Sequence, residues 1–415
     1  MSGFKKDIQY FKFCLYGFLK NLRFFEPFLL LIFLYVKELS YTQIGVLYSV
    51  RFIVRSLLEI PSGIMADAMG RKGTMLFSYA FYILSFAGYF YSDSFLPLII
   101  STVLFASGDA FRTGTHKAMI FEYLKQNKMS DFKVDYYGHT RSWSQLGSAL
   151  SAIIAAGLLL IENNYNNVFL YSIIPYSIGF IMLATYPRYL NGNIKRFSLK
   201  TIGIKESLDV IKISFNSMKH SSSIKLLLNV AFFSGFYLAI KDYLQIILSK
   251  SASVFKLDYD FVNVQSNREI IIIGLVYFAM YFLTAAAARN AGNLSSRFTT
   301  VRGYLNILYI VGAAGGVISG IFYREELMLI AVFLFIAVLV IQNLRRPACV
   351  AVISDSFNPK VHASVLSFES QFSSVTGALF SLLLGMLADN YGAGFGIAVI
   401  SGSLIISLPL VYLRK

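Results

Sequence analysis

The sequence predicts an all-α membrane protein with twelve transmembrane helices in two groups of six. Three observations support this prediction: few charged residues, twelve apolar runs of spanning length, and Lys and Arg concentrated in alternate loops. Only 14% of the 415 residues are charged and 56% are hydrophobic, whereas a soluble domain has about 25% charged residues. So few polar side chains cannot cover a soluble globule, and a lipid bilayer removes that requirement.

The apolar runs fall into two sets separated by a polar stretch. A spanning helix needs about 20 mostly apolar residues, and the first set of such runs covers residues 14–36, 41–64, 73–92, 95–115, 139–161 and 167–186. The second set covers residues 223–249, 269–291, 303–322, 326–346, 363–387 and 393–413. We therefore expect a six-helix bundle over 1–186, a cytoplasmic linker over 187–222, and a second six-helix bundle over 223–415.

The basic residues in the loops predict the orientation. If the N-terminus is cytoplasmic, about 26 Lys and Arg residues lie on the cytoplasmic side and about five on the other side. This bias predicts a multi-pass protein of the bacterial inner membrane with both termini in the cytoplasm. The net charge of +15 is spread over short loops between apolar runs, so we do not expect nucleic acid as a partner.

The loop between the second and third predicted helices carries a motif, Gly63-Ile-Met-Ala-Asp67-Ala-Met-Gly70-Arg71-Lys72. It resembles the loop signature of the major facilitator superfamily, Gly-x-x-x-Asp-x-x-Gly-Arg-Arg/Lys, at that family's usual position. The resemblance implies a secondary transporter with two pseudo-symmetric bundles that rock about a central site. It also implies that these five residues gate transport by latching the two halves on the cytoplasmic side. Locally, we expect Gly63 to allow close helix packing, Gly70 to allow a tight turn, and Asp67 to pair with Arg71 or cap the next helix.

Three other segments indicate which branch of the superfamily the chain resembles. Residues 22–28, 58–63 and 138–145 are similar to a bacterial branch of the superfamily without an assigned substrate, which loosely resembles drug/proton antiporters. The antiporter signature of the fifth helix is absent, and that helix instead carries small residues that suit close packing, such as Gly147 and Gly157. A second Gly-x-x-x-Asp-x-x-Gly pattern runs from Gly385 to Gly392. It lies outside the repeat-equivalent loop, so we expect it to serve packing.

Charged residues within the predicted spans are candidates for function, because each costs about 2.5–3.5 kcal/mol to insert. Three carboxylates are proton-coupling candidates: Glu26 first, with Asp109 and Glu369 as alternatives. We expect the substrate cavity to draw on Arg23, Arg51, Arg55, Glu59, Arg112, Gln145, Lys241, Asp242 and Gln371. Arg51 and Arg55 of the second predicted helix, with Arg112, would attract an anionic group of the substrate. The alternative is that these charges pair with one another and hold the helices in register.

The sequence lacks the signatures of several other classes. It has no phosphate-binding Gly-x-x-x-x-Gly-Lys-Ser/Thr loop, no His or Cys with metal-ligand spacing, and no converging catalytic set. We therefore expect no cofactor and no enzymatic activity. The expected function is proton-coupled export of a small organic solute by a monomer in contact with membrane lipids. Uptake of an anionic metabolite is the alternative, and a non-transporting membrane receptor is a weaker one because no loop is long enough for a receptor domain.

Overall fold

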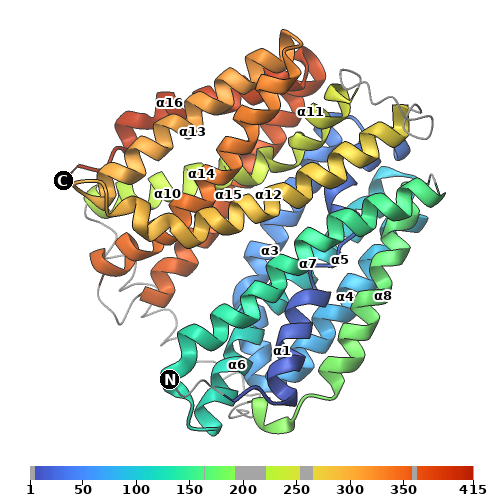
Figure 1. The fold of residues 1–415 in the computed structure, drawn as a ribbon, viewed down its shortest axis with the longest axis vertical. Coiled ribbons are helices and arrows are strands. Elements are labelled where there is room, and N and C mark those ends of the chain that lie inside the picture. Colours follow the sequence, from blue (N-terminus) through green and yellow to red (C-terminus); the bar gives the residue numbers. More distant parts are fainter. Residues whose placement is uncertain (1–4, 163, 192–220, 253–264, 358–361, 415) are drawn as a thin grey trace. The chain divides into compact units, whose positions relative to one another are not determined.

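The computed structural model describes residues 5–162, 164–191, 221–252, 265–357 and 362–414 (Figure 1). Every regular element in these ranges is a helix. Most of the predicted linker, residues 192–220, and the loop 253–264 lie outside the described residues.

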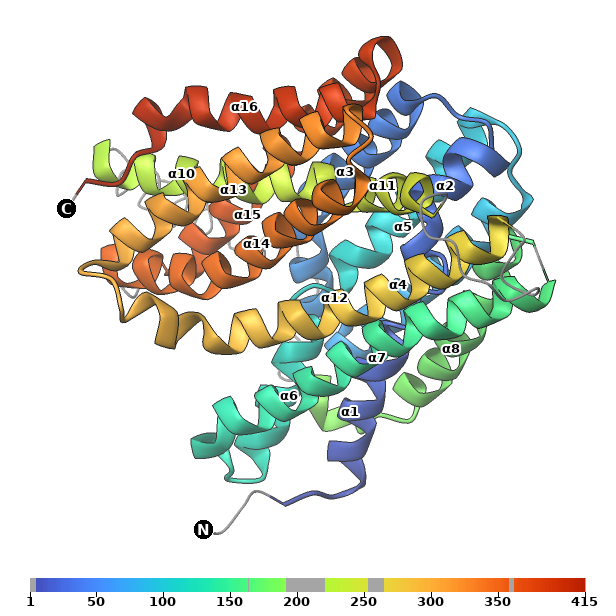
Figure 2. The same cartoon turned by 45° about the horizontal axis from the view of Figure 1, so that its top comes forward.

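The first predicted set of spans corresponds to a series of helices that Figures 1 and 2 show in blue to green. The series is α1 (Ile8–Leu19), η1 (Glu26–Phe28), α2 (Leu29–Leu31), η2 (Ile32–Val36), α3 (Tyr41–Met69), α4 (Arg71–Tyr91), α5 (Phe95–Arg112), α6 (Thr115–Gln126), η3 (Ser130–Phe132), α7 (Lys133–Glu162), α8 (Asn167–Ala184) and η4 (Arg188–Asn191). The pieces from α1 to η2 follow one another over the first predicted span, and α5 and α6 are separated only by a short break.

The second set corresponds to the helices drawn in yellow-green to red. These are α10 (Ser221–Ile240), η5 (Lys241–Tyr243), α11 (Leu244–Ser251), α12 (Gln265–Ser295), α13 (Val301–Arg324), α14 (Met328–Ser356), α15 (His362–Tyr391) and α16 (Ala393–Val411). All twelve predicted runs therefore coincide with a helix or a chain of helices, and the predicted all-α membrane fold is confirmed.

Two of the predicted runs differ from the helices at a proline. The first run is broken before Pro27, because proline lacks an amide hydrogen and its ring clashes with the carbonyl four residues earlier. The run 326–346 continues through Pro347 to Ser356. Among the described helices, nine are long and apolar enough to cross a membrane, and two shorter apolar helices cover Glu26–Val36 and Ala393–Ile406. Helix α3 is not among these, and it carries Arg51, Arg55 and Glu59.

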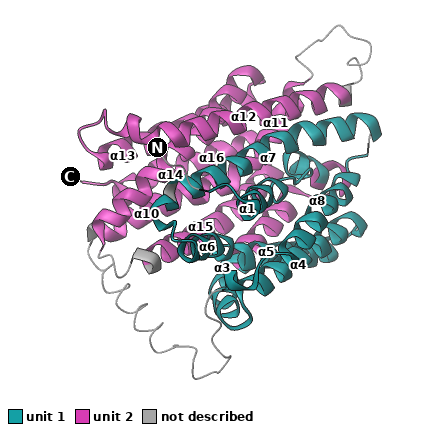
Figure 3. Cartoon of the chain, turned by 60° about the horizontal axis from the view of Figure 1, so that its bottom comes forward, with its two compact units in different colours: residues 1–32, 54–202 teal, residues 33–53, 203–415 magenta. Residues whose placement is uncertain are grey.

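The chain divides into two compact units (Figure 3). Unit 1 comprises residues 1–32 and 54–202, and unit 2 comprises residues 33–53 and 203–415. The boundary crosses α3 between residues 53 and 54, so the first half of this helix packs with the C-terminal helices. The predicted bundle limits, 1–186 and 223–415, remain predictions.

Small residues bring helices of unit 1 close together. Helix α4 packs against α5 and α8, and α1 packs against α7. A Cβ atom at Gly147 of α7 would lie 2.5 Å from the carbonyl oxygen of Phe18 in α1, so only glycine fits there. The amide of Asn21 donates a 2.7 Å hydrogen bond to the carbonyl of Ser144. Without a hydrophobic drive in lipid, such close contacts and interhelical hydrogen bonds hold helices together.

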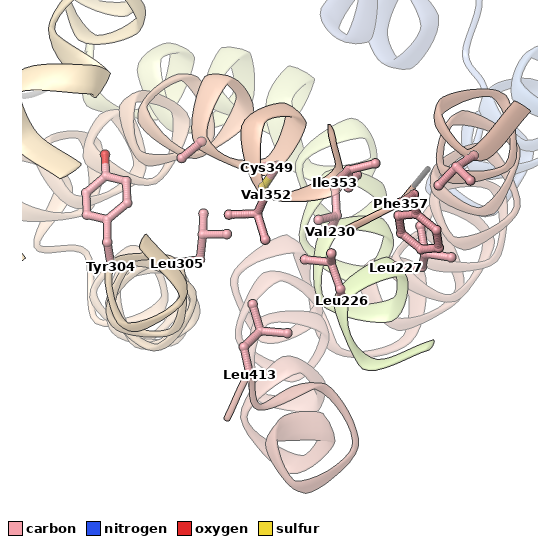
Figure 4. Packing of buried hydrophobic residues seen from close by; sticks show 12 residues of the cluster. Leu226, Leu227, Val230, Tyr304, Leu305, Cys349, Val352, Ile353, Phe357 and Leu413 are labelled. Atoms are coloured by element: carbon pink, nitrogen blue, oxygen red, sulfur yellow. The ribbon is translucent and has the colours of Figure 1, made fainter. Parts of the chain in front are cut away.

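Unit 2 contains an apolar cluster where α10, α13, α14 and the C-terminal segment meet (Figure 4). Leu226 and Val230 of α10, Leu305 of α13, Ile353 of α14 and Leu413 are all buried there. Two buried amides tie the chain end to the cluster, because Asn229 donates to the carbonyl of Val411 and Asn306 donates to that of Leu413. Helix α13 also packs closely against α14 and α16, and α10 packs against α15.

Candidate functional site

The predicted gate loop lies between α3 and α4. Gly70 has φ +87° and precedes the first residue of α4, a conformation that glycine adopts at little cost. This confirms the expected tight turn. The guanidinium of Arg71 contacts the carboxylate of Glu122 in α6 at 3.5 Å and donates to the carbonyl of Ala118 at 3.2 Å. Arg71 therefore holds α4 against α6.

The same loop binds the chain that follows α8. The backbone N–H of Lys72 donates to the side-chain oxygen of Asn191 at 2.9 Å, and the Lys72 ammonium donates to the carbonyl of Tyr186 at 3.0 Å. Asn191 thus caps the N-terminus of α4 from a distant part of the chain. A Cβ atom at Gly70 would lie 2.9 Å from the amide carbon of Asn191, so this contact also requires glycine.

Two local expectations for the loop are wrong. A Cβ atom at Gly63 would meet nothing within 4 Å, so Gly63 makes no close helix contact in the described part of the chain. Asp67 is exposed and neither pairs with Arg71 nor caps α4. The reason is competition, since Glu122 takes the guanidinium and Asn191 takes the first free amide of the helix.

A buried charge network lies inside unit 1. Arg23 sits in the break between α1 and η1, and its Nε donates to the Tyr176 hydroxyl at 2.6 Å. A second guanidinium nitrogen of Arg23 lies 3.3 Å from Oδ1 of Asp109. The guanidinium also lies over the rings of Tyr82 and Phe105, at 4.9 and 4.8 Å from their centroids. These contacts compensate the cost of a buried cation.

Asp109 lies at the centre of the network. Its Oδ1 accepts a 2.5 Å hydrogen bond from the Tyr82 hydroxyl and contacts Arg112 at 3.5 Å as well as Arg23. One buried carboxylate therefore lies between two guanidinium groups. Glu26 lies 3.7 Å from Arg23, but its side chain keeps 28% of its exposure. Of the three proton-coupling candidates, only Asp109 and Glu369 are fully buried.

Sequence reasoning identified the four charged members of this network and missed its two tyrosines. The pairs three residues apart, Arg23 with Glu26 and Asp109 with Arg112, both form. Tyr82 and Tyr176 supply the hydroxyls that complete the network, but nothing in the sequence separates them from the other tyrosines in the spans.

A second buried carboxylate, Glu369 of α15, lies in unit 2. Its Oε1 accepts a 2.7 Å hydrogen bond from Arg346 of α14 and a 2.9 Å bond from Ser373. Its Oε2 is buried and has no hydrogen-bond partner among the described residues. The Glu369 side chain is 1% exposed, whereas that of Arg346 is 46% exposed.

Arg345, next to Arg346, is a buried cation that the sequence analysis missed. Its guanidinium donates to the carbonyl of Leu305 at 2.6 Å and to the side-chain oxygen of Asn229 at 2.7 Å, and it lies 4.3 Å from the ring centroid of Phe233. The sequence signal was present, because an apolar run resumes after Pro347. Ending the predicted span at residue 346 placed both arginines at its last two positions, where a charged side chain is ordinary, so neither stood out as a candidate.

The remaining predicted cavity residues are divided between the two units. Lys241 contacts its neighbour Asp242 at 2.7 Å, and Tyr48 lies close enough to Asp242 and Arg51 to interact electrostatically with both. Arg51 belongs to unit 2, whereas Arg55 and Glu59, which also lie on α3, belong to unit 1. The two predicted glutamines, one in each unit, are half-buried: Gln145 and Gln371.

Comparison with known proteins identifies the family. Residues 13–368 match the family model of the Major Facilitator Superfamily. The uncharacterized MFS-type transporter YxaM of Bacillus subtilis (strain 168) is 25% identical over 189 residues, which make up 46% of this chain and 45% of that protein. The chain thus aligns with less than half the length of this curated relative.

Several solved transporters share the fold. The nucleoside transporter NupG aligns with a TM-score of 0.71 at 12% identity, over 98% of this chain and 97% of NupG. A bacterial homolog of the human lysosomal transporter Spinster, in an inward-facing and unoccupied conformation, aligns with a TM-score of 0.74 at 13% identity, over 98% and 97% of the two chains. A D-xylose-proton symporter aligns with a TM-score of 0.67 at 13% identity, over 98% and 95%. The family-model match over residues 13–368, with the gate-loop motif and the shared fold, shows that the chain belongs to the major facilitator superfamily of membrane transporters.

Proposed function

We propose that this chain exports a small organic solute in exchange for protons, and that Glu369 is the carboxyl group that couples the two movements. The observation that carries the proposal is the unequal burial of the Glu369–Arg346 pair. The carboxylate is fully buried with one oxygen unpartnered, whereas nearly half of the arginine side chain is exposed.

The unequal burial makes the two charges respond differently when the pair separates. Arg346 keeps its charge because a guanidinium is not deprotonated in proteins. An ionised Glu369 left alone in the helix bundle would be an uncompensated buried charge, which is strongly unfavourable. Separation of the pair therefore favours the protonated form of Glu369, and re-formation of the pair favours release of that proton. Proton coupling requires such a group, one that binds a proton in one transport state and releases it in another.

Glu369→Gln tests this proposal. The amide keeps the shape of the side chain and one oxygen acceptor, but it cannot exchange a proton. In proteoliposomes with an imposed pH gradient, we expect gradient-driven accumulation of substrate to fall by at least about tenfold. Exchange of labelled for unlabelled substrate, which needs no net proton movement, should persist. Vesicles of both orientations distinguish export from uptake.

The exposed carboxylate Glu325 provides the control. Glu325→Gln makes the same chemical change at the end of α13, and we expect normal gradient dependence. If Glu369→Gln accumulated substrate as the wild-type protein does, Glu369 would not be the coupling group. Loss of both accumulation and exchange would assign Glu369 a structural role instead.

Two further observations support parts of the proposal. One solved protein of the same fold is described as a D-xylose-proton symporter, so the fold is compatible with proton coupling. The export direction follows the resemblance of residues 22–28 and 138–145 to an antiporter-like branch. The loop charges support placement in a bacterial inner membrane with both termini in the cytoplasm, and reporter fusions at the two termini would check it.

Uptake of an anionic metabolite is a second candidate function, favoured by Arg55. This half-buried guanidinium has no carboxylate within 4.0 Å in the described ranges, unlike Arg112, which pairs with Asp109. A charge-assisted hydrogen bond contributes about 1.5–3 kcal/mol. If Arg55 binds the substrate anion, Arg55→Gln should raise the KM for uptake about tenfold or more. Arg289→Gln, at an exposed arginine of α12, serves as the control. An unchanged KM in Arg55→Gln would remove this candidate.

A further inference from the structure

The gate-loop signature has a second copy with the same backbone geometry. Gly63, Asp67 and Gly70 have the spacing i, i+4, i+7, and Gly385, Asp389 and Gly392 repeat it. Gly70 and Gly392 both have φ +87°, and each precedes the first residue of the next helix, α4 or α16. The sequence pattern from Gly385 to Gly392 is therefore a structural repeat of the gate turn.

The two aspartates differ in what they bind. Oδ1 of Asp389 accepts a 2.8 Å hydrogen bond from the backbone N–H of Tyr41, and Oδ2 accepts a 2.7 Å bond from that of Thr42. Both donors belong to the first turn of α3, where amides have no partner within the helix and the helix dipole attracts a negative charge. Asp67, at the other end of α3, makes no such contact in the described part of the chain. The aspartate of the second copy, Asp389, therefore caps a helix, whereas the aspartate of the first copy, Asp67, caps none among the described residues.

The Asp389 cap closes a seam between the first half of α3 and the second half of α15, both in unit 2. A Cβ atom at Gly45 would lie 2.5 Å from the carbonyl oxygen of Ser381, and one at Gly385 would clash with the carbonyl of Tyr41. The Ser49 hydroxyl donates to the carbonyl of Ala378 at 2.6 Å. The contacts recur about once per helical turn along the two helices, so the seam is continuous over this stretch.

We propose that Asp389 is the latch of a second gate, which holds the seam shut in one transport state and releases it in the other. Asp389 is exposed, so water can replace the two amides without leaving a buried charge. Helix α3 passes from unit 2 into unit 1 between residues 53 and 54, so its first half is the segment that must leave unit 2 when the seam opens. The proposal rests on the transport activity of the family and not on proton coupling through Glu369.

The latch predicts that weakening the cap exposes the seam. In a Cys14→Ala, Cys349→Ala background, Ser381→Cys places a thiol at a buried seam position that is 2% exposed. In nanodiscs we expect a polar maleimide to label this thiol slowly. Asp389→Asn removes the charge and one of the two acceptors, and it should speed labelling about tenfold, the change expected from losing a helix cap. Asp389→Glu, which keeps the carboxylate, should restore part of the slow rate.

Asn390→Ala is the matched control, because Asn390 is the next exposed residue and, among the described residues, its side chain bonds to its own helix, at the carbonyl of Met386. It should leave the labelling rate within about twofold of that of the parent protein, which carries only Cys14→Ala, Cys349→Ala and Ser381→Cys. Labelling of Asp389→Asn at the parent rate, or equal acceleration by Asn390→Ala, would overturn the proposal.

A second variant keeps the test valid if Asp389→Asn does not fold. Gly45→Ala presses on the Ser381 carbonyl without touching the cap, whereas Gly402→Ala on α16 meets no atom closer than 3.9 Å. We expect the thiol of Ser381→Cys to be labelled faster when Gly45→Ala is added. Gly402→Ala should leave the labelling rate of Ser381→Cys unchanged. No acceleration in Gly45→Ala would show that the seam does not open, and the latch would be rejected. The readout needs no substrate, so it stays informative if proton coupling fails.

Discussion

Asp109→Leu is expected to lower the free energy of unfolding by about 3–5 kcal/mol, the usual cost of removing one partner of a buried ion pair. The substitution leaves Arg23 and Arg112 without their shared carboxylate. It also leaves the Tyr82 hydroxyl without its acceptor. Because Arg23 is buried and lies between aromatic rings, water cannot replace the lost carboxylate at low cost.

Equilibrium unfolding in mixed micelles, followed by fluorescence, measures this effect. Trp143 is the only tryptophan and lies in α7 of unit 1, so its signal reports on the unit that contains the network. Asp131→Leu is the control, because Asp131 is exposed in η3, and it should change stability by less than about 0.5 kcal/mol. The loss in the free energy of unfolding for Asp109→Asn should lie between those of Asp109→Leu and Asp131→Leu. A loss below about 1 kcal/mol in Asp109→Leu would show that the arginines do not depend on this carboxylate.

Gly147→Ala and Gly157→Ala are expected to have opposite effects, although both glycines belong to α7. A methyl group at Gly147 would meet the backbone carbonyl of Phe18 at 2.5 Å, which cannot move without shifting α1. Overpacking of this kind costs about 1–3 kcal/mol. A methyl group at Gly157 would meet nothing within 4 Å, and alanine in a helix is favoured over glycine by about 0.5–1 kcal/mol.

The same unfolding measurement checks this pair, and each variant is the control for the other. We expect Gly147→Ala to unfold at a lower mole fraction of the denaturing detergent than the wild-type protein. Gly157→Ala should unfold at an equal or higher mole fraction. Equal behaviour of the two variants would mean that the α1–α7 contact is looser than the structure shows.

Features that depend on local sequence were predictable. The twelve apolar runs predicted the places and the order of the helical segments, because a bilayer accepts only segments whose backbone hydrogen bonds are satisfied internally. Helix geometry gave the contacts three residues apart, Arg23 with Glu26 and Asp109 with Arg112. The gate-loop signature also gave the turn at Gly70, because that backbone conformation strongly favours glycine.

Features that depend on helix packing were decided by the tertiary structure. Arg23 and Asp109 are 86 residues apart, and Tyr41 and Asp389 are 348 apart. No periodicity in either segment specifies such a partner. The sequence fixes which face of a helix is polar, but which helix meets that face depends on close steric fit along the whole length of both helices. For this reason Gly147 and Gly157 look alike in the sequence, and only their neighbours distinguish them.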